Sequence, residues 1–459
     1  MSASNEIATR SSESIVEQAL DTTLRAGADS ADIVLVRGRS LEARVRDETV
    51  EFVKQAQEQV LGIRVLMQGE GGMKTAVTST SDLATPAIEQ MARETVALAR
   101  ATEADPAAGL PEDGFATHLP DLSLVEPSDR DTQVDVRIDD ARAAERAARA
   151  YDERITNSEG SQIGSDFSTI AYGNSNGFVG QYESASHSLF SEPIAGSGEN
   201  MQRDYWMTAA RKLAELDSPE QVGRLAAERA VRRLNARQVS TTVVPVIFES
   251  MLAAGLIRQL ASLVSGYSVY RESSFLCDKL GEVIAAPSVT IIDDGRLPGG
   301  LGSKPFDGEG LPTRRNVLVE NGKLNTWLLD SYSGRKLGFP STGNASRGAG
   351  SPPGVGTTNL WLEPGNESLD DIIARTDRGL LVTELLGMGF NPVTGDYSRG
   401  AAGLWIEGGE IAYPVEEITI AGHFGKMLEE IDAIGSELLW MGSVAAPALR
   451  IASMTVAGE

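Results

Sequence analysis

The feature that most constrains the fold is a stretch near the N-terminus in which apolar and charged residues alternate. The segment SLEARVRDETVEFVKQA fills residues 40–56, between the apolar runs ADIVLVRG (31–38) and QVLGIRVLMQGEGGMKTAVT (59–78). Because successive side chains of a strand point to opposite faces, this alternation is typical of antiparallel strands with one face in water. We therefore predict an antiparallel meander in this region.

Segments with apolar residues at helical spacing flank this meander and recur up to about residue 235. Ser218 followed by Pro219 suits the N-cap and first turn of one such helix. The predicted helices cover residues 12–27, 85–102, 133–152 and 218–236. A segment rich in Pro, Asp and Gly (104–132) reads as a long connection, and 161–196 as several short strands with an Asn-Ser-Asn-Gly turn at 174–177.

The pattern changes near residue 240. A β-branched strand (241–250) precedes a helix (250–266) that we expect to end at Gly266, and glycines and short strands then dominate. Asn321-Gly322 predicts a type I′ hairpin turn, and the Gly-Gly pair in EGGE predicts a second hairpin.

These patterns indicate an α+β fold rather than a parallel α/β fold. A chain of 459 residues is also too long for one compact core. We predict an N-terminal domain over residues 1–235 with an antiparallel sheet and helices, in sub-segments of about 1–115 and 120–235. Residues 240–459 should form a glycine-rich, mostly antiparallel β domain with a few helices.

Charge and composition exclude several classes of function. The formal net charge is −24 and no long Lys/Arg cluster occurs, so the surplus of cations needed to neutralise phosphates is missing and nucleic acid is not an expected partner. A single cysteine, Cys277, excludes a disulfide framework and fits a reducing cytoplasm. The sequence has neither an apolar run long enough for a membrane helix nor the pattern of a signal peptide, so we expect no membrane association.

One concentration of polar residues lies between 293 and 338. Its carboxylates would bind a hard cation or share a proton if they converged, but Asp-Gly pairs are also ordinary turn residues, and both interpretations remain open. The residues concerned are Asp293, Asp294, Asp307, Glu309 and Asp330.

A second concentration, NPVTGDYSRG at 391–400, reads as a loop that needs Gly395 and Gly400 for backbone freedom. This segment is either a binding site or only a structural loop that connects two elements. Its polar residues are Asn391, Thr394, Asp396, Tyr397, Ser398 and Arg399.

Metal-ligand patterns are missing. The three histidines, His118, His187 and His423, are dispersed, and none has a His, Cys or Glu at the i+3 or i+4 spacing that places two ligands on one helix face. Cys277 follows Ser-Phe-Leu and is expected to be a buried structural thiol.

The second half of the chain also resembles a known family. The segments VPVIFE, SGYSVYRESSFLCDKLGE, PFDGEGLPTRRNVLVENGKL, LLDSYSGRKLG and NPVTGDYSRGAAGLWIEGGEIAYPV are similar to the TldD/PmbA family, also labelled "modulator of DNA gyrase", whose PmbA branch is also called TldE. The resemblance extends over essentially the whole chain and is most specific after residue 240. It implies a two-part molecule and a partnership. TldD-like members resemble zinc peptidases with an HExxxH helix, and PmbA-like members pair with them in a heterodimer that encloses a cavity and acts on unfolded peptides.

The sequence departs from the TldD pattern where zinc would bind. After the strand, it reads MLAAGLIRQLASLVSG, with Arg258, Gln259 and Leu260 roughly where the motif would fall, and the C-terminal stretch LLWMGSVAAPALR has no cysteine. The resemblance therefore implies the PmbA/TldE branch, with no zinc in this chain and zinc on a TldD-like partner.

We accordingly expect a non-catalytic subunit of a TldD/TldE-type metalloprotease complex that completes the chamber and holds unfolded peptide, with a homodimer plausible when the chain is alone. The first alternative is a stand-alone hydrolase with a carboxylate-built site around Asp293, Asp307 and Glu309. The second is a non-enzymatic interaction protein. The substrate- or partner-binding candidates are Asp307, Glu309, Arg314, Asn391, Thr394, Asp396, Ser398 and Arg399.

Overall fold

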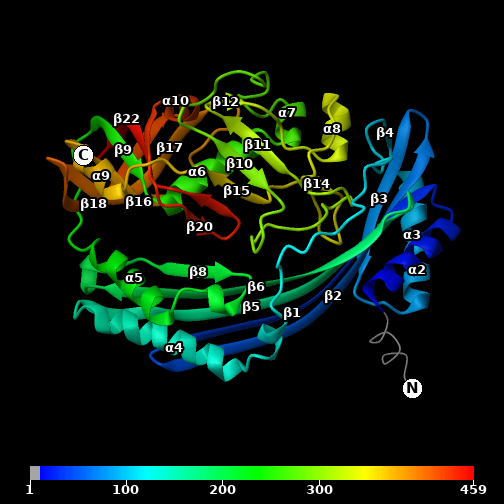
Figure 1. Cartoon of the computed structure of the whole chain (residues 1–459), viewed down its shortest axis with the longest axis horizontal. Helices are drawn as coiled ribbons and strands as arrows, with labels where there is room; N and C mark the ends of the chain where they lie inside the picture. The colour runs from blue at the N-terminus through cyan, green and yellow to red at the C-terminus, as the bar shows by residue number, and fades with distance from the viewer. Residues whose placement is uncertain (1–10, 459) are drawn as a thin grey trace.

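The N-terminal part of the computed structural model is built on one curved antiparallel sheet (Figure 1). The structure describes residues 11–458, and residues 1–10 and 459 lie outside the described part of the chain. The strand order is β4-β3-β2-β1-β5-β6-β7, and β8 also pairs with β6. These strands are β1 (Ser30–Arg46), β2 (Thr49–Gly69), β3 (Gly72–Thr80), β4 (Ala104–Asp105), β5 (Ile155–Asn174), β6 (Val179–Ala195), β7 (Gln202–Arg203) and β8 (Trp206–Ala210).

The central strands are longer than the sequence predicts. The predicted runs at 31–38 and 40–56 are not separate strands, because β1 continues to Arg46 and the chain reverses at Asp47-Glu48, where both residues have positive φ. The prediction of several short strands at 161–196 is also wrong: β5 and β6 are two long paired strands, although the turn after Asn174 is confirmed. Local turn residues mark the reversals, but they do not show how far a strand extends.

Two helix pairs cover one face of this sheet, and all four predicted helices are confirmed. Alternate residues of β1 contact both pairs: Ile33 and Leu35 pack with the first pair, and Ala43 and Val45 with the second. The Ser218 hydroxyl accepts a hydrogen bond from the Gln221 N–H, as expected of an N-cap. The pairs are α2 (Ser12–Arg25) with α3 (Thr85–Ala101), and α4 (Val134–Tyr151) with α5 (Pro219–Val231). Short 3₁₀ turns are η1 (Pro127–Asp131), η2 (Gly198–Asn200) and η3 (Leu213–Glu215).

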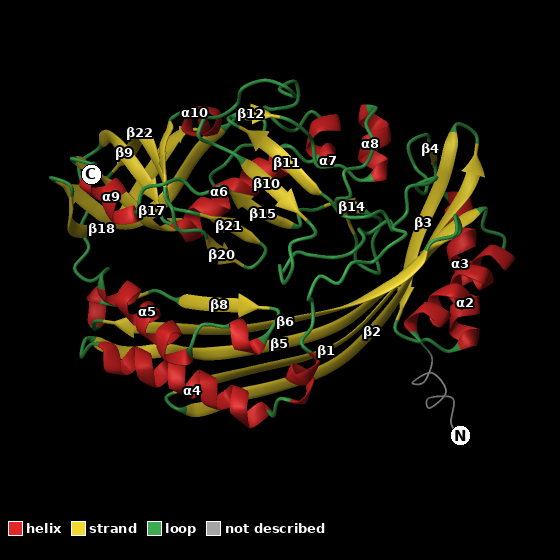
Figure 2. Ribbon diagram, viewed as in Figure 1, coloured by secondary structure: helices red, strands yellow, loops and turns green. Residues whose placement is uncertain are grey.

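The C-terminal domain lies on the opposite, concave side of the sheet (Figures 1 and 2). The ring of Phe306 lies 5.2 Å from the ring of Phe178 and 5.2 Å from that of Tyr182, both on or next to the sheet. The domain is therefore held against the sheet partly by an aromatic cluster.

Two six-stranded sheets form the C-terminal domain, with a short pair, β13 (Ala345–Ser346) and β14 (Gly354–Val355), beside them. The first sheet contains β12 (Lys323–Leu324), β11 (Arg315–Glu320), β10 (Ile291–Asp294), β15 (Asn359–Leu362), β21 (Val444–Ala446) and β20 (Leu439–Met441). The second contains β18 (Glu410–His423), β17 (Asp396–Glu407), β16 (Arg378–Leu386), β9 (Thr242–Phe248), β22 (Leu449–Ala457) and β19 (Ile431–Ile434). Because β18 also pairs with β22, five strands of the second sheet close into a ring.

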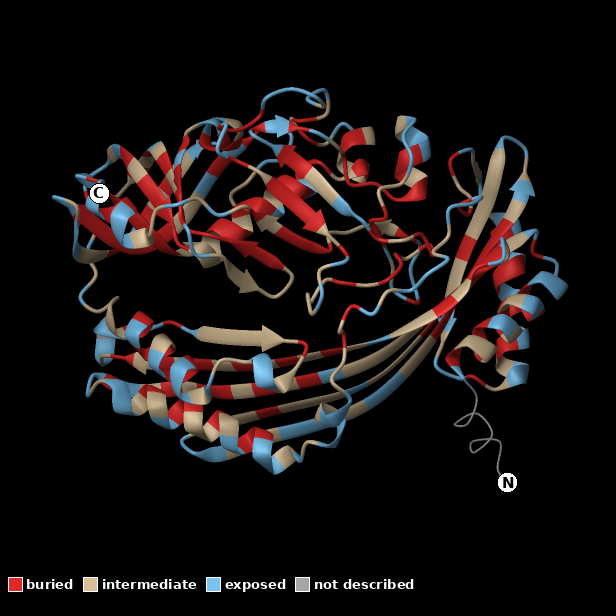
Figure 3. Ribbon diagram, viewed as in Figure 1, coloured by how far each residue is buried: buried red, intermediate tan, exposed pale blue. Residues whose placement is uncertain are grey.

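The helix after β9 lies between these two sheets and contacts strands of both. This helix, α6 (Ser250–Leu263), ends earlier than predicted, and Gly266 begins the next helix instead of ending this one. The elements around α6 carry many buried residues (Figure 3), which form the largest hydrophobic cluster of the described chain. The other helices are α7 (Gly266–Tyr270), α8 (Ser331–Leu337), α9 (Leu369–Ala374) and α10 (Phe424–Glu429).

Both predicted hairpin turns are confirmed. Asn321 and Gly322 have positive φ and join β11 to β12, and Gly408 and Gly409 do the same between β17 and β18. The mixture of helices with antiparallel sheets confirms the α+β fold class. Over the described residues, no helix is long and apolar enough to cross a membrane.

Candidate functional site

The predicted carboxylates at 293–338 are largely buried and bound to backbone or side-chain donors. Asp293 on β10 accepts hydrogen bonds from the Thr358 N–H and hydroxyl and from Asn344 Nδ2, and burial raises its pKa to about 6. Asp294 accepts from the Arg296 N–H in a local turn. Asp330 is the N-cap of α8 and forms a capping box. Turn and cap chemistry therefore accounts for Asp294 and Asp330, whereas Asp293 is a buried strand carboxyl whose hydrogen-bond donors lie far along the chain.

Asp307 and Glu309 share a buried loop and influence each other's charge. Asp307 accepts from the N–H groups of Glu309, Leu311 and Ala345, and burial raises its pKa to about 6, against the attraction of Lys304. Burial, followed by repulsion from Asp307, raises the pKa of Glu309 to about 7. The structure thus brings together part of the predicted carboxylate set.

A buried ion cluster lies beside this loop and joins the two domains. Asp32 on β1 accepts from Arg64 Nε on β2 at 2.9 Å and pairs with Arg347, which belongs to the C-terminal domain. Burial alone would raise the pKa of Asp32, but Arg347 and Arg64 hold it below its usual value. Two buried arginines therefore keep this carboxylate ionised.

Between the domains, next to Glu309 and Arg64, lies a pocket of about 420 Å³. Three tyrosines form much of its wall. The rings of Tyr267 and Tyr332 stack with centroids 5.8 Å apart, and the Tyr270 ring lies 5.4 Å and 6.0 Å from them. The remaining lining residues are Thr75, Asp105, Ala108, Gly109, Ser265, Arg271, Pro352, Pro353, Gly354 and Val355.

Hydrogen bonds hold the hydroxyl groups of two of these tyrosines, Tyr267 and Tyr332. The Tyr267 hydroxyl, between Asp330 Oδ2 and the Pro353 carbonyl, lies 3.2 Å from each, and the Tyr332 hydroxyl donates to Asp105 Oδ2 at 2.7 Å. Burial and the nearby carboxylates raise the pKa of both tyrosines, so both hydroxyls stay protonated at neutral pH. Sequence reasoning missed this pocket; the paired tyrosines in GYSVY were the one available signal.

The second predicted group lies elsewhere, at the start of β17. The Asn391 side chain accepts from the Val393 N–H, and the Thr394 hydroxyl donates to Asp396 Oδ2 at 2.6 Å. Only 391–395 form a turn, because Asp396, Ser398 and Arg399 belong to the strand, whereas the sequence predicted a loop throughout. Asp396 and Ser398 are exposed on one face and Arg399 is half-buried, with Nη2 3.5 Å from the Leu385 carbonyl. Arg314 is exposed and stands apart from this group, just before β11.

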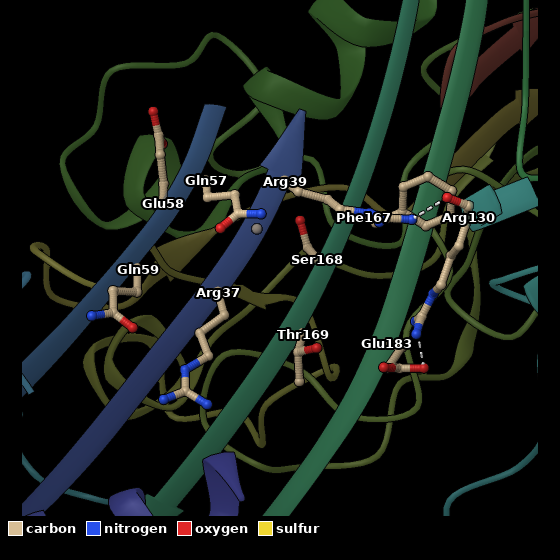
Figure 4. Close-up of a pocket in the computed structure, with 11 residues that line it drawn as sticks. Arg37, Arg39, Gln57, Glu58, Gln59, Arg130, Phe167, Ser168, Thr169 and Glu183 are labelled. Atoms are coloured by element: carbon tan, nitrogen blue, oxygen red, sulfur yellow. Dashed lines mark hydrogen bonds and ion pairs between the residues drawn. The ribbon is translucent and has the colours of Figure 1, made fainter. Parts of the chain in front are cut away.

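A larger groove, of about 590 Å³, crosses the helix-bearing face of the N-terminal sheet between the two helix pairs (Figure 4). Arg39, Arg130 and Glu183 in this groove are engaged in contacts within the protein. Arg39 lies over the ring of Phe167 and donates to the Arg130 carbonyl, and Arg130 pairs with Glu183 at 2.8 Å. Two of the arginines of this groove are therefore already engaged and are not free to hold an anion.

Possible zinc ligands do not converge in the described part of the chain, where no group of three or more His, Cys, Asp or Glu residues could hold a metal ion. His118 is exposed in the 104–132 connection, and His187 is buried against Ser165 in the N-terminal sheet. His423 ends β18, 3.0 Å from the Thr394 carbonyl. The Cys277 thiol is half-buried rather than buried and lies 3.5 Å from the Val269 carbonyl. These donors do not fit a zinc site.

Three family models match the chain in succession. They describe PmbA/TldA metallopeptidase domain 1 (residues 31–99), the central domain (127–234) and the C-terminal domain (241–458). Together they extend over most of both domains.

Similar proteins carry related names. "Metalloprotease PmbA" of Escherichia coli O157:H7 is 38% identical over 449 residues, which cover 97% of this chain and 96% of that protein. A "Metalloprotease PmbA homolog" of Haemophilus influenzae is 38% identical over 97% of this chain and 95% of its own length. A crystal structure of a protein described as a modulator of DNA gyrase, from Bacteroides thetaiotaomicron, superposes with a TM-score of 0.89 at 27% identity, covering 97% of this chain and 99% of that one.

A TldE structure from Thermococcus kodakarensis superposes with a TM-score of 0.86, covering 97% of this chain and all of that one. Its 24% identity supports the shared fold alone.

Proposed function

Because the chain belongs to the PmbA/TldD metallopeptidase family, we propose that it is the PmbA/TldE-type subunit of a two-subunit peptidase that acts on unfolded peptides. In this proposal a TldD-type partner supplies the zinc, and this chain completes the chamber and helps to hold the peptide. We place the complex in the cytoplasm, because the sequence has a single cysteine and no disulfide framework.

The observation that carries the proposal is the composition of α6. This helix follows β9 and lies between the two C-terminal sheets, yet its sequence, SMLAAGLIRQLASL, contains no His, Cys, Asp or Glu. A catalytic zinc site takes three protein ligands, and a helical site takes two of them from one helix face. The helix at this position supplies none, which supports a subunit that works beside a metal-bearing partner.

Peptide binding is supported by a free strand edge in the C-terminal domain. Among the described strands β20 pairs only with β21 and ends the first sheet, whereas the outer edge of β12 is bonded to residues 281–284. An extended peptide gains backbone hydrogen bonds at such an edge with little dependence on its sequence. We propose that unfolded substrate is held in this way while the partner cleaves it.

The test is metal content and peptidase activity of the purified chain, alone and after co-expression with a TldD-type protein from the same organism. We expect no bound zinc and no cleavage from the chain alone, and about one zinc per heterodimer with chelator-sensitive cleavage. Zinc near one per isolated chain, with chelator-sensitive cleavage, would instead support the carboxylate-built hydrolase. Partner activity that is the same with and without this chain would refute the proposal and support an interaction protein.

A further inference from the structure

We propose that the tyrosine-lined pocket between the domains binds the alkylammonium group of a peptide, either its N-terminal amine or a lysine side chain. This inference rests on the proposed function, since it names the part of the substrate that this chain would recognise. It concerns Tyr267, Tyr270 and Tyr332 together with the carboxyl of Glu309, all of which line the pocket.

The aromatic walls are the first argument. The three rings pack on one another with centroids 5.4–6.0 Å apart, one pair stacked, one tilted and one edge-on, and form an aromatic wall of the pocket. The face of an aromatic ring attracts a cation through its quadrupole, so such a wall favours an ammonium ligand. The chain already shows this attraction: the guanidinium of Arg271 lies 5.5 Å and 5.4 Å from the centres of the Tyr267 and Tyr270 rings.

The negative charge at the pocket is the second argument. Glu309 is 1% exposed, and within the described chain its carboxyl accepts one hydrogen bond, from the Ser331 N–H to Oε2. Four acceptor sites on a carboxylate leave room for an ammonium donor. Asp105, by contrast, already binds Tyr332 and Lys336.

The arginines at the pocket do not make it an anion site. Arg64 is committed to Asp32 through two of its nitrogens. Arg271 is exposed at the rim, lies near the faces of both tyrosine rings and donates from Nε to the Tyr270 hydroxyl at 3.0 Å, so it occupies the position that an incoming cation would take. We therefore expect Arg271 to compete with an ammonium ligand, whereas it would assist a carboxylate ligand.

The raised pKa of Glu309 predicts how ammonium binding changes with pH. Burial, repulsion from Asp307 and repulsion from Asp330 raise its pKa to about 7, while Arg64 opposes them. A bound ammonium group stabilises the ionised form, so binding releases protons near neutral pH. A lysine probe, which stays charged across this range, should bind more tightly at pH 8 than at pH 6.

The experiment is calorimetric titration of the intact purified chain with three short alanine-rich peptides. One has a free N-terminus, one is N-acetylated, and one is N-acetylated with a single lysine. We expect the free-amine peptide, the lysine peptide or both to bind at millimolar concentrations, and which of them binds identifies the source of the ammonium group. The acetylated peptide without lysine should bind at least about tenfold more weakly.

Single-residue variants test whether the pocket recognises a cation or an anion. Glu309→Gln and Tyr270→Ala should each weaken ammonium binding about tenfold, Tyr270→Phe should retain it, and Arg271→Ala should strengthen it. Glu58→Gln in the groove of Figure 4 and Arg224→Ala on α5 make matched charge changes at exposed positions and should leave binding unchanged.

Equal binding of the acetylated and amine peptides, no binding of any amine probe, or weaker binding after Arg271→Ala would each overturn the inference. The last result would indicate that the pocket binds a carboxylate group instead.

An assay of the complex with the TldD-type partner separates this inference from the proposed subunit function. If cleavage requires this chain but does not respond to acetylation or to Glu309→Gln, the subunit role stands and the ammonium pocket does not.

Discussion

At the scale of single residues, the contact between the two domains depends on one buried carboxylate. Asp32 comes from the first strand of the chain, and its partners Arg64 and Arg347 come from β2 and from the C-terminal domain. All three side chains are at most 8% exposed. A buried ion pair adds little net stability when intact, but removing one partner leaves an uncompensated charge, which is costly.

Replacing Asp32 by Asn should therefore lower the free energy of unfolding by about 3–5 kcal/mol, because Arg64 and Arg347 lose their shared counter-charge. Urea denaturation at pH 7 measures this. The control is Asp21→Asn, whose exposed pair with Arg25 should contribute less than about 1 kcal/mol. Equal losses in the two variants would contradict the prediction.

The same variant carries a pH dependence. The folded-state pKa of Asp32 lies below its usual value of 3.8, so its ionisation stabilises the fold above that pH. That stabilisation is lost as pH falls through the lowered pKa. The gap between wild type and Asp32→Asn should accordingly be full at pH 7 and narrower in acid.

At the scale of elements, close backbone approach decides where the domains meet. A Cβ added to Gly62 on β2 would lie 1.7 Å from the carbonyl oxygen of Ala349, so only glycine lets this loop of the C-terminal domain touch the strand. Gly255 on α6 is the opposite case, because a Cβ there would meet nothing within 4 Å. Gly62 is therefore required for the close contact between the domains, whereas the packing around Gly255 does not require glycine.

Gly62→Ala should destabilise the protein by about 1–3 kcal/mol, because the loop at Ala349 must move away from β2. Gly255→Ala should stabilise it by roughly 0.5–1 kcal/mol, since alanine loses less backbone freedom in a helix. Thermal unfolding of both variants beside wild type tests this, and a Gly62→Ala protein as stable as the Gly255→Ala protein would disprove the close approach.

At the scale of the whole molecule, charge sets the choice of partner. The formal net charge of −24 gives the chain an overall repulsion toward phosphate backbones. Two structures with the same fold are described as modulators of DNA gyrase. The charge of this chain argues against a direct contact with DNA.

We expect no complex between the purified chain and duplex DNA at about 0.15 M salt, because too few cations are available to release counterions. A gel-shift titration with a basic DNA-binding protein as positive control measures this. A shifted band that weakens as salt rises would show direct phosphate contacts and contradict the prediction.

The sequence alone determined the local structure and the family. The helices, the Asn321-Gly322 hairpin and the reversal after Asn174 each follow from neighbouring residues, because capping, helical spacing and positive φ act over a few positions. The motifs of the second half identified the PmbA/TldD family, which the comparisons confirm. The sequence also shows directly that the helix following β9 contains no histidine.

Only the tertiary structure decided the lengths of β1 and β5, the burial of Glu309 and the makeup of the pocket. The length of a strand depends on pairing partners far along the chain. The same Asp-Gly residues form an exposed turn or a buried loop, depending on which other segments pack against them. The pocket joins Arg64 of β2 to tyrosines of α7 and α8, residues that no local pattern relates. Their convergence follows from the C-terminal domain lying against the concave face of the sheet.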